Sequence, residues 1–170
     1  MRPDLLTATL AAAPVPRWPA VDPLADAVNP ALGLLLFWLA LAAWRAGRCR
    51  EVVGLPLTLV AMLCVAYALA YFDRALGIFG LFGLDFSTHG AVHLAAWTAL
   101  LVWQPWRWPW ALAVTLAYHA LMLAQGYHTI HDLLATAAVV GLPLALLATG
   151  LRPVARRRAG SAPPGHNARS

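Results

Sequence analysis

Charged residues are scarce in this 170-residue chain, and lysine is absent from it. Asp, Glu, Lys and Arg together make up 11% of the sequence, whereas apolar residues make up 61%. Soluble domains carry about one quarter charged residues, so this composition excludes an ordinary soluble domain. All 12 cations are arginine, as is common in GC-rich bacterial genomes, and we therefore expect a bacterial inner-membrane protein.

Cysteine is also rare. Cys49 stands beside an arginine cluster and Cys64 lies within an apolar run, so the sequence supports neither a disulfide framework nor a zinc site built on cysteine. The sequence pI of about 10 would suit a nucleic-acid ligand. However, the arginines flank apolar runs, where the membrane orientation rule accounts for them. We expect membrane lipids and no nucleic acid as partners.

The apolar runs predict an all-α bundle of about five membrane spans, because a bilayer is crossed by about 20 apolar residues in a helix. We expect the spans over residues 24–44, 52–72, 90–103, 111–125 and 129–149. Residues 23–151 would then form a single transmembrane domain. The proline-containing residues 1–22 are expected to be a loose or interfacial segment, and residues 152–170 a basic, disordered tail.

The arginines predict how the bundle is oriented. Five spans leave three arginines, Arg2, Arg17 and Arg74, on the side of the N-terminus. Since positive loops stay in the cytoplasm, the N-terminus is expected outside and the C-terminus inside. The inner side receives the other nine: Arg45, Arg48, Arg50, Arg107, Arg152, Arg156, Arg157, Arg158 and Arg169.

The last apolar run opens with an unusual polar group, Tyr127-His128-Thr129-Ile130-His131-Asp132. An ionisable residue inside a membrane helix costs roughly 2.5–3.5 kcal/mol and usually marks a functional cavity. His128 and Asp132 are four residues apart, so on one helix they would share a face. We therefore expect Asp132 to orient His128 and to stabilise its charged form.

A second histidine is predicted at the same membrane depth. His89 opens the span expected at 90–103, and the third and fourth spans return the chain to the outer face before His128. Two histidines, one of them backed by a carboxylate, suit nucleophilic phosphoryl transfer without a metal. His128 would attack phosphorus while Asp132 holds its far nitrogen. His89 would protonate the leaving oxygen and later activate water or an alcohol.

These residues carry a family resemblance. Ser87-Thr88-His89 resembles the Ser-Gly-His element of the type 2 phosphatidic acid phosphatase superfamily, and residues 128–132 resemble its later His-x-x-x-Asp element. Residues 85–89 are closer still to the Asp-x-x-Phe-Ser-Gly-His form of sphingomyelin-synthase-like phosphotransferases. The resemblance covers residues 73–150. It implies a lipid-phosphate phosphatase or phosphotransferase at the outer membrane face, with a phosphohistidine on His128 and with His89 and Asp132 as catalytic partners.

The cationic elements of that superfamily are largely missing here. Its first element, a lysine followed by Arg-Pro, has no counterpart, and Leu121 and Met122 stand where a Ser-Arg pair would precede the nucleophile. Because phosphoryl transfer needs cations around the phosphate oxygens, we predict that Arg74, the cation nearest the site, binds substrate. Ser87 and His119 are further candidates for substrate contact, with helix capping as the alternative role of Ser87.

Two other functions use the same histidines. In a zinc-dependent membrane hydrolase, His89 and His93 would share a helix face and bind the metal together with His128 or His131 and with Asp132. A compact motif such as His-Glu-x-x-His is absent. In a non-catalytic membrane protein, the cluster would only join helices through hydrogen bonds.

Overall fold

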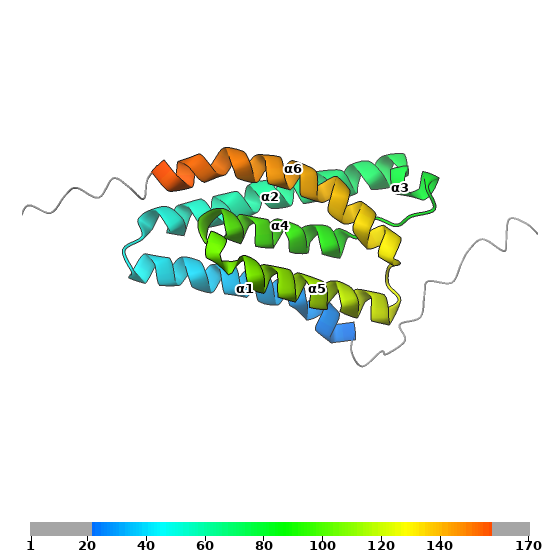
Figure 1. The fold of residues 1–170 in the computed structure, drawn as a ribbon, viewed down its shortest axis with the longest axis horizontal. Helices are drawn as coiled ribbons and strands as arrows, with labels where there is room; N and C mark the ends of the chain where they lie inside the picture. The colour runs from blue at the N-terminus through cyan, green and yellow to red at the C-terminus, as the bar shows by residue number, and fades with distance from the viewer. Residues whose placement is uncertain (1–21, 158–170) are drawn as a thin grey trace, which may run out of the picture.

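The chain is all-α, as the sequence predicts (Figure 1). The computed structural model describes residues 22–157. A short 3₁₀ helix, η3 (Pro105–Arg107), joins two of the helices, α4 and α5. The α-helices are α1 (Asp22–Arg45), α2 (Cys49–Leu76), α3 (Ile78–Leu81), α4 (Thr88–Trp103), α5 (Trp108–Gln125) and α6 (Ile130–Arg157).

Helix α4 lies at the centre of the bundle. It packs against α1, α2, α5 and α6, and Figure 1 shows α2 and α6 on one side of it and α1 and α5 on the other. Nine of its 16 residues are buried. Helices α4 and α5 run in opposite directions, so the chain returns to the end of the bundle at which α4 starts.

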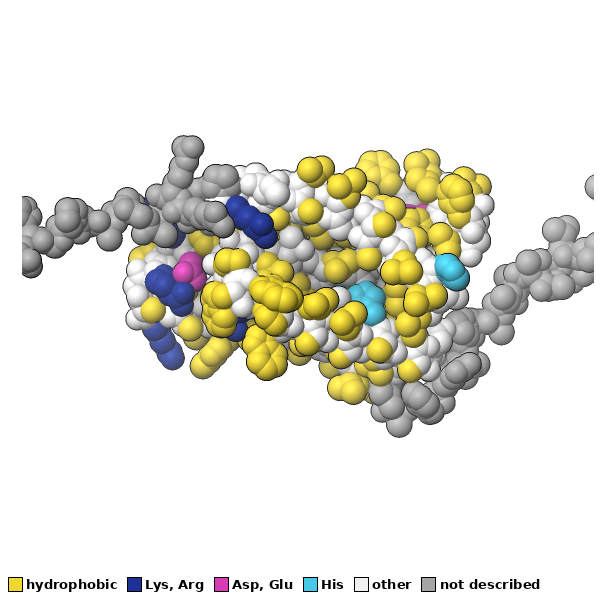
Figure 2. All heavy atoms as spheres, in the orientation of Figure 1, with side chains coloured by type: hydrophobic (Ala, Val, Ile, Leu, Met, Phe, Trp, Pro, Cys, Tyr) yellow, Lys and Arg dark blue, Asp and Glu magenta, His cyan; other side chains and the backbone are white. Residues whose placement is uncertain are grey.

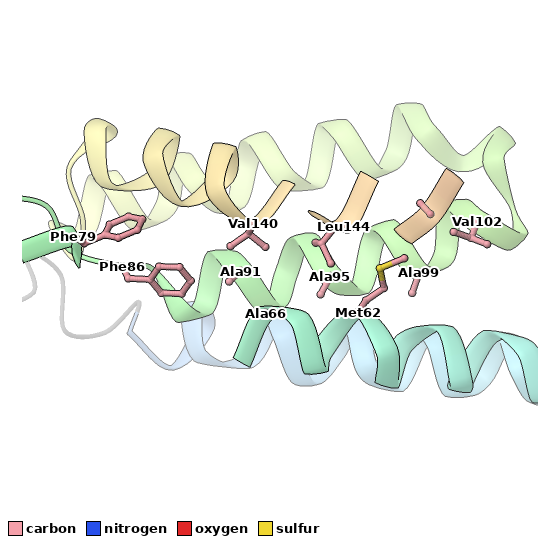
Figure 3. Close-up of a cluster of buried hydrophobic side chains, with 11 residues drawn as sticks. Met62, Ala66, Phe79, Phe86, Ala91, Ala95, Ala99, Val102, Val140 and Leu144 are labelled. Atoms are coloured by element: carbon pink, nitrogen blue, oxygen red, sulfur yellow. The ribbon is translucent and has the colours of Figure 1, made fainter. Parts of the chain in front are cut away.

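Small side chains explain why α4 can occupy the centre. Ala91, Ala95 and Ala99 follow one another at four-residue intervals, and all three are fully buried. Helices in a membrane attract one another mainly through close packing, which small residues permit. The alanines therefore bring the backbone of α4 close to its neighbours. The same cluster holds side chains of α2 and α6, labelled in Figure 3: Met62, Ala66, Val140 and Leu144.

The outer surfaces of α1, α2 and α6 are apolar. Phe37, Leu57 and Leu142, one from each helix, are all more than half exposed. Pro23–Arg45, Cys49–Leu76 and Ile130–Arg152 are each long and apolar enough to cross a membrane. Since water-soluble proteins rarely expose large contiguous apolar patches, hydrocarbon is the medium that suits this surface. The chain is therefore an integral membrane protein.

The predicted spans correspond in order to α1, α2, α4, α5 and α6. Helices α4 and α5 have 16 and 18 residues and are not among the three candidate spans. Helix α2 begins and ends outside the predicted 52–72, and α6 continues through Arg157. The predicted disorder is thus wrong for residues 152–157, which are helical. The predictions for residues 1–21 and 158–170 lie outside the described residues.

The two ends of the bundle differ in charge. Figure 2 shows arginine side chains gathered toward the end where α1 meets α2, and histidines farther toward the other end. At the arginine end, Arg48 pairs with Glu51 at 2.9 Å, and Gln104 Nε2 donates to Glu51 Oε2 at 3.4 Å. These contacts tie the α1–α2 turn to the end of α4. The opposite end holds the starts of α4 and α6.

The segment between α2 and α4 folds back onto that opposite end. Asp73 Oδ1 accepts the backbone N–H of Phe79 at 2.7 Å, which fixes the start of α3 against the end of α2. Phe79 and Phe86 are both buried, and their rings meet edge to face with centroids 5.2 Å apart. This contact anchors α3 to the segment that follows it and places Asp85 close to the start of α4.

The packing of α2 on α4 predicts the effect of a side chain at Gly54. A Cβ there would overlap the indole ring of Trp103, whose N–H donates to Thr58 Oγ1 at 3.0 Å. We expect Gly54→Ala to displace the ring and to lower the free energy of unfolding by about 1–3 kcal/mol, seen as a lower melting temperature in detergent. Gly141→Ala is the control, because nothing lies within 4 Å of its added Cβ. Equal melting temperatures of the two variants would contradict this packing.

Candidate functional site

His89 and His128 line one cavity at the end of the bundle where α4 and α6 begin. The cavity has a volume of about 310 Å³. We call it the histidine cavity. Residues 89 and 128 are brought together because α4 and α5 return the chain to the same end. The remaining lining residues come from α1, from the segment before α4, from α5 and from the α5–α6 turn: Ala25, Asp26, Asp85, Tyr118, Met122 and Tyr127.

The turn between α5 and α6 holds His128 outside both helices. Gly126 has φ 76°, a left-handed conformation that glycine adopts without steric cost. The backbone N–H of Tyr127 then donates to the carbonyl of Met122 at 3.2 Å. Helix α6 does not begin until Ile130. The expectation that His128 and Asp132 share a helix face is therefore wrong, because His128 precedes the helix.

Asp132 forms a reciprocal cap with Thr129 instead. Thr129 Oγ1 accepts the backbone N–H of Asp132 at 3.2 Å, and Asp132 Oδ2 accepts the backbone N–H of Thr129 at 2.7 Å. The Thr129 hydroxyl also lies 2.7 Å from the same carboxylate oxygen, to which it donates. This is a capping box with aspartate as its acidic member. Thr-x-x-Asp ahead of an apolar run is a local signal that the sequence already contains.

The second oxygen of Asp132 reaches another part of the chain. Asp132 Oδ1 accepts the backbone N–H of Asp85 at 2.8 Å. One turn farther along α6, Thr136 Oγ1 accepts the backbone N–H of Ser87 at 3.0 Å. Both oxygens of the buried Asp132 carboxylate are therefore occupied by structural hydrogen bonds. They fix the segment before α4 against the first turns of α6.

The carboxylate that faces His128 belongs to Asp85. Asp85 Oδ2 lies 3.2 Å from His128 Nδ1, which is ion-pair distance without the alignment of a hydrogen bond. The His128 side chain is 11% exposed, whereas that of Asp85 is 76% exposed. Asp85 is part of the sequence pattern described above, but the sequence led us to predict Asp132 as the carboxylate that orients His128. Only the folding of residues 77–87 onto the α5–α6 turn brings Asp85 to His128.

Burial and charge act on His128 in opposite directions. Burial of the imidazole lowers its pKa from the ordinary value and is the largest effect. The carboxylates of Asp85 and Asp132 raise the pKa of His128, and His89 lowers it. The net effect is a lowered pKa. His128 is therefore neutral at neutral pH, which is the state in which a ring nitrogen can act as a nucleophile.

His89 is held through its backbone and leaves its ring accessible. Asn29 Nδ2 donates to the carbonyl of His89 at 3.1 Å, across the α1–α4 contact. The ring Nε2 lies 4.0 Å from Asp26 Oδ1, and the side chain is 56% exposed. Each histidine of the cavity therefore has a carboxylate near it. Asp26 and Asn29 are polar residues near the start of the first apolar run, but the sequence does not indicate that both contact His89 on α4.

The buried His93 has a structural role that its contacts define. Trp97 Nε1 lies 3.1 Å from His93 Nε2, and since an indole N–H can only donate, Nε2 must accept. Nδ1 then carries the proton and donates to Asn29 Oδ1 at 3.3 Å. The ring also packs against Tyr118, with centroids 4.6 Å apart. His93 thus joins α1, α4 and α5.

Three predicted substrate-binding residues lie outside the lining of the histidine cavity. The Ser87 hydroxyl is buried and accepts the backbone N–H of Gly90 at 3.2 Å, so it caps α4. His119 Nδ1 lies 2.7 Å from the carbonyl of Thr115, and its ring contacts that of His93. Arg74 lines a neighbouring cavity together with Asp85.

The zinc alternative lacks a converging donor set. Both ring nitrogens of His93 are occupied, and His131 is exposed on the first turn of α6. Within residues 22–157, no three His, Cys, Asp or Glu side chains are arranged to hold a metal ion. The i,i+4 spacing of His89 and His93 therefore reflects one exposed and one buried histidine on the same helix.

The hydrogen bonds of Asp132 predict the effect of removing one acceptor. Asp132→Asn preserves the shape of the side chain but leaves the N–H of Asp85 or Thr129 facing an amide nitrogen. We expect the free energy of unfolding to fall by about 1–3 kcal/mol, measured by thermal unfolding in detergent. Asp26→Asn makes the same chemical change on a side chain that is 73% exposed and should alter stability by about 0.5 kcal/mol or less. An unchanged stability of Asp132→Asn would contradict the structural role of this carboxylate.

Comparison of the chain with protein-family models, with curated proteins and with solved structures found no match. The family resemblance of residues 85–89 and 128–132 stays a prediction. The function is therefore inferred from the cavity itself.

Proposed function

We propose that this protein is an integral membrane phosphatase or phosphotransferase that acts on lipid phosphates through a phosphohistidine on His128. The observation that carries the proposal is the meeting of His89 and His128, from two separate segments, in the lining of one cavity. Its volume of about 310 Å³ falls at the lower end of the range of ligand pockets, about 300–1,000 Å³. Such a cavity would accommodate a phosphate headgroup while the lipid tails stay in the membrane.

The reaction would proceed in two displacements at phosphorus. In the first, Nε2 of His128 forms a bond to phosphorus as the bond to the leaving oxygen breaks, and protonated His89 gives its proton to that oxygen. In the second, water or an alcohol attacks the phosphohistidine, the phosphorus–nitrogen bond breaks, and His89 takes up the proton. His128 and His89 are both restored.

Asp85 is the carboxylate that would orient the nucleophile. If it accepts the Nδ1 proton of His128, the lone pair on Nε2 is free for attack. The 3.2 Å contact is not aligned as a hydrogen bond, but catalytic hydrogen bonds often tighten only when substrate binds. Asp132 would position Asp85 rather than contact the nucleophile, because it accepts a hydrogen bond from the backbone N–H of Asp85.

Positive potential at the histidine cavity would come mainly from backbone dipoles. None of the eight described residues that line it is Arg or Lys. The N-termini of α4 and α6 lie at this end, and each favours an anion by about 0.3–1 kcal/mol. Asp26 and Asp85 oppose this, so the cavity alone would hold a phosphate weakly. Arg74, which lines the neighbouring cavity that shares Asp85, would add positive charge.

We place the cavity at the outer face of the membrane. Helices α4 and α5 would cross as a hairpin, giving five spans in all with α1, α2 and α6. The positive-inside rule then puts the arginine end of the bundle in the cytoplasm, because Arg45, Arg48, Arg50 and Arg107 lie there. We infer a bacterial inner-membrane location with the N-terminus outside.

Turnover by the purified protein tests the proposal. In detergent, the protein should release phosphate from a lipid phosphate, or transfer it to an alcohol, in the presence of EDTA, and vanadate should inhibit the reaction. We expect His128→Ala to lower kcat by about 10³-fold or more, because the nucleophile is lost. His131→Ala is the matched control, since that exposed histidine is three residues away. Full activity of His128→Ala would refute the assignment, and loss of turnover on chelation would favour the zinc hydrolase.

The pH dependence of kcat/KM tests the pairing of Asp85 with His128. Protonation of His128 removes the nucleophile, and its pKa is lowered by burial, so activity should persist below about pH 6.5, the ordinary histidine value. Asp85 raises this pKa, so Asp85→Asn should move the acid limb to still lower pH while lowering kcat.

Glu51→Gln, at the opposite end of the bundle, should leave the profile unchanged. An acid limb of Asp85→Asn that stays in place, or moves to higher pH, would show that Asp85 does not act on the nucleophile.

A further inference from the structure

The end of the bundle opposite the histidine cavity presents a surface of arginine side chains. They come from the ends of α1 and α2 that flank their turn, from η3 and from α6, and Figure 2 shows dark blue side chains gathered there. Glu51 is the only acidic residue of the described chain at this end, since the others lie near the starts of α1, α4 and α6 or near the end of α2. We call this the arginine surface, made of Arg45, Arg48, Arg50, Arg107 and Arg152.

The one acidic residue is already paired within the protein. Arg48 Nη1 lies 2.9 Å from both carboxylate oxygens of Glu51, and Gln104 Nε2 donates to Oε2 at 3.4 Å. Gln104 is buried, and its Oε1 accepts the N–H of Arg107 Nε. A chain of hydrogen bonds therefore joins the α1–α2 turn to η3. Five arginines against one glutamate leave the surface with a surplus of four positive charges.

The guanidinium of Arg107 is fixed in orientation. Its central carbon lies 4.3 Å from the centroid of the Trp106 ring, over which it stacks, and its Nε is held by Gln104. A guanidinium has five N–H donors, so those of Nη1 and Nη2 remain to meet an anion. Their planar fork matches the oxygens of a phosphate. The membrane orientation rule accounts for positive charge at this end, but it does not require a guanidinium held in this way.

Exposed tryptophans place the arginine surface at the depth of lipid headgroups. Trp44, Trp106, Trp108 and Trp110 lie at this end, and all are at least 60% exposed. Tryptophan is enriched where a membrane meets water, with its ring at the level of the headgroups. Because Arg107 stacks on Trp106, its guanidinium lies at that same level. The anions found there are the phosphates of the lipids.

We propose that the arginine surface binds anionic phospholipids of the phosphatidylglycerol class through their phosphates. A zwitterionic lipid would bring an ammonium group toward the surplus positive charge, whereas phosphatidylglycerol brings only its anion. Basic residues beside a membrane span attract anionic lipids in this way. Such binding is independent of the reaction proposed at the histidine cavity, which lies at the other end of the bundle.

Quenching of tryptophan fluorescence by brominated lipids measures this preference at the arginine surface, because four exposed tryptophans lie there. The full-length protein is reconstituted in phosphatidylcholine bilayers. Phosphatidylglycerol or phosphatidylcholine with brominated acyl chains then replaces the same small fraction of the lipid. We expect phosphatidylglycerol to bind at least about fivefold more tightly than phosphatidylcholine at low salt. Equal quenching by the two brominated lipids would overturn the proposal.

Two substitutions locate the preference on the arginine surface. Arg107→Gln removes the fixed fork and should lower the ratio of the two binding constants by about threefold or more. Arg152→Gln, an exposed change on α6, should lower the ratio as well, and melting temperatures in detergent show whether each variant is folded. His131→Gln is the control, because His131 is exposed at the opposite end. An unchanged ratio in both arginine variants would overturn the proposal.

Removal of the acidic residue should have the opposite effect. Glu51→Gln releases Arg48 from its ion pair and should raise the ratio by about two- to fivefold. Asp26→Asn makes the same change in net charge on a side chain that is 73% exposed at the other end of the bundle, and it should leave the ratio as it is. Equal increases in the two variants would show that net charge, and not this surface, attracts the lipid.

A soluble polyanion is the competing occupant of a basic surface. A short DNA duplex should not bind the protein in phosphatidylcholine nanodiscs at physiological salt, because the tryptophans hold the arginines against the headgroups. Micromolar binding of the duplex that Arg107→Gln abolishes would assign the surface to nucleic acid and overturn the lipid proposal.

Discussion

The site depends on the carboxylate of Asp132, which joins two distant segments of the chain. One oxygen caps the start of α6 through Thr129, and the other accepts the backbone N–H of Asp85. A buried carboxylate is stable only when its charge is hydrogen-bonded, so these contacts constrain both segments at once. His128 lies in the turn before the cap, and His89 lies just after the segment that Asp85 begins. Asp132 therefore constrains the relative positions of His89 and His128, although its carboxylate hydrogen-bonds to neither side chain.

The central position of α4 has a related consequence for the polar groups buried in the bundle. His93 donates a hydrogen bond to Asn29 and accepts one from Trp97 inside the bundle, where an unpaired imidazole would be costly. The alanine face of α4 allows close approach of α2 and α6, while its polar face meets α1 and α5. The same helix thus carries the tightest packing and the buried polar contacts. These contacts hold the N-terminus of α4, where His89 lies, at the histidine cavity.

The charged side chains differ between the two adjoining cavities. The histidine cavity has a carboxylate near each of its two imidazoles, and these carboxylates oppose strong retention of an anion there. Arg74 lines the neighbouring cavity, which shares Asp85 with the histidine cavity. Under the proposed function, Arg74 would contribute affinity for the phosphate and the histidine cavity would supply the reactive groups. Asp85, which lines both, would be sensitive to what either one contains.

The five long helices and their order follow from the sequence alone, because apolar run length and capping residues are local properties. The Thr129–Asp132 cap was also readable there, although the i,i+4 pairing with His128 was inferred in its place. That His89 and His128 reach the same end follows from the number of helices between them. The choice of Asp85 as the carboxylate beside His128, and the separation of Arg74 from both histidines, were decided only by tertiary structure. Both depend on how residues 77–87 fold back against α6. The hydrogen bond from Asp85 to Asp132, for example, joins residues 47 apart in the sequence. No local pattern encodes a contact between segments so far apart.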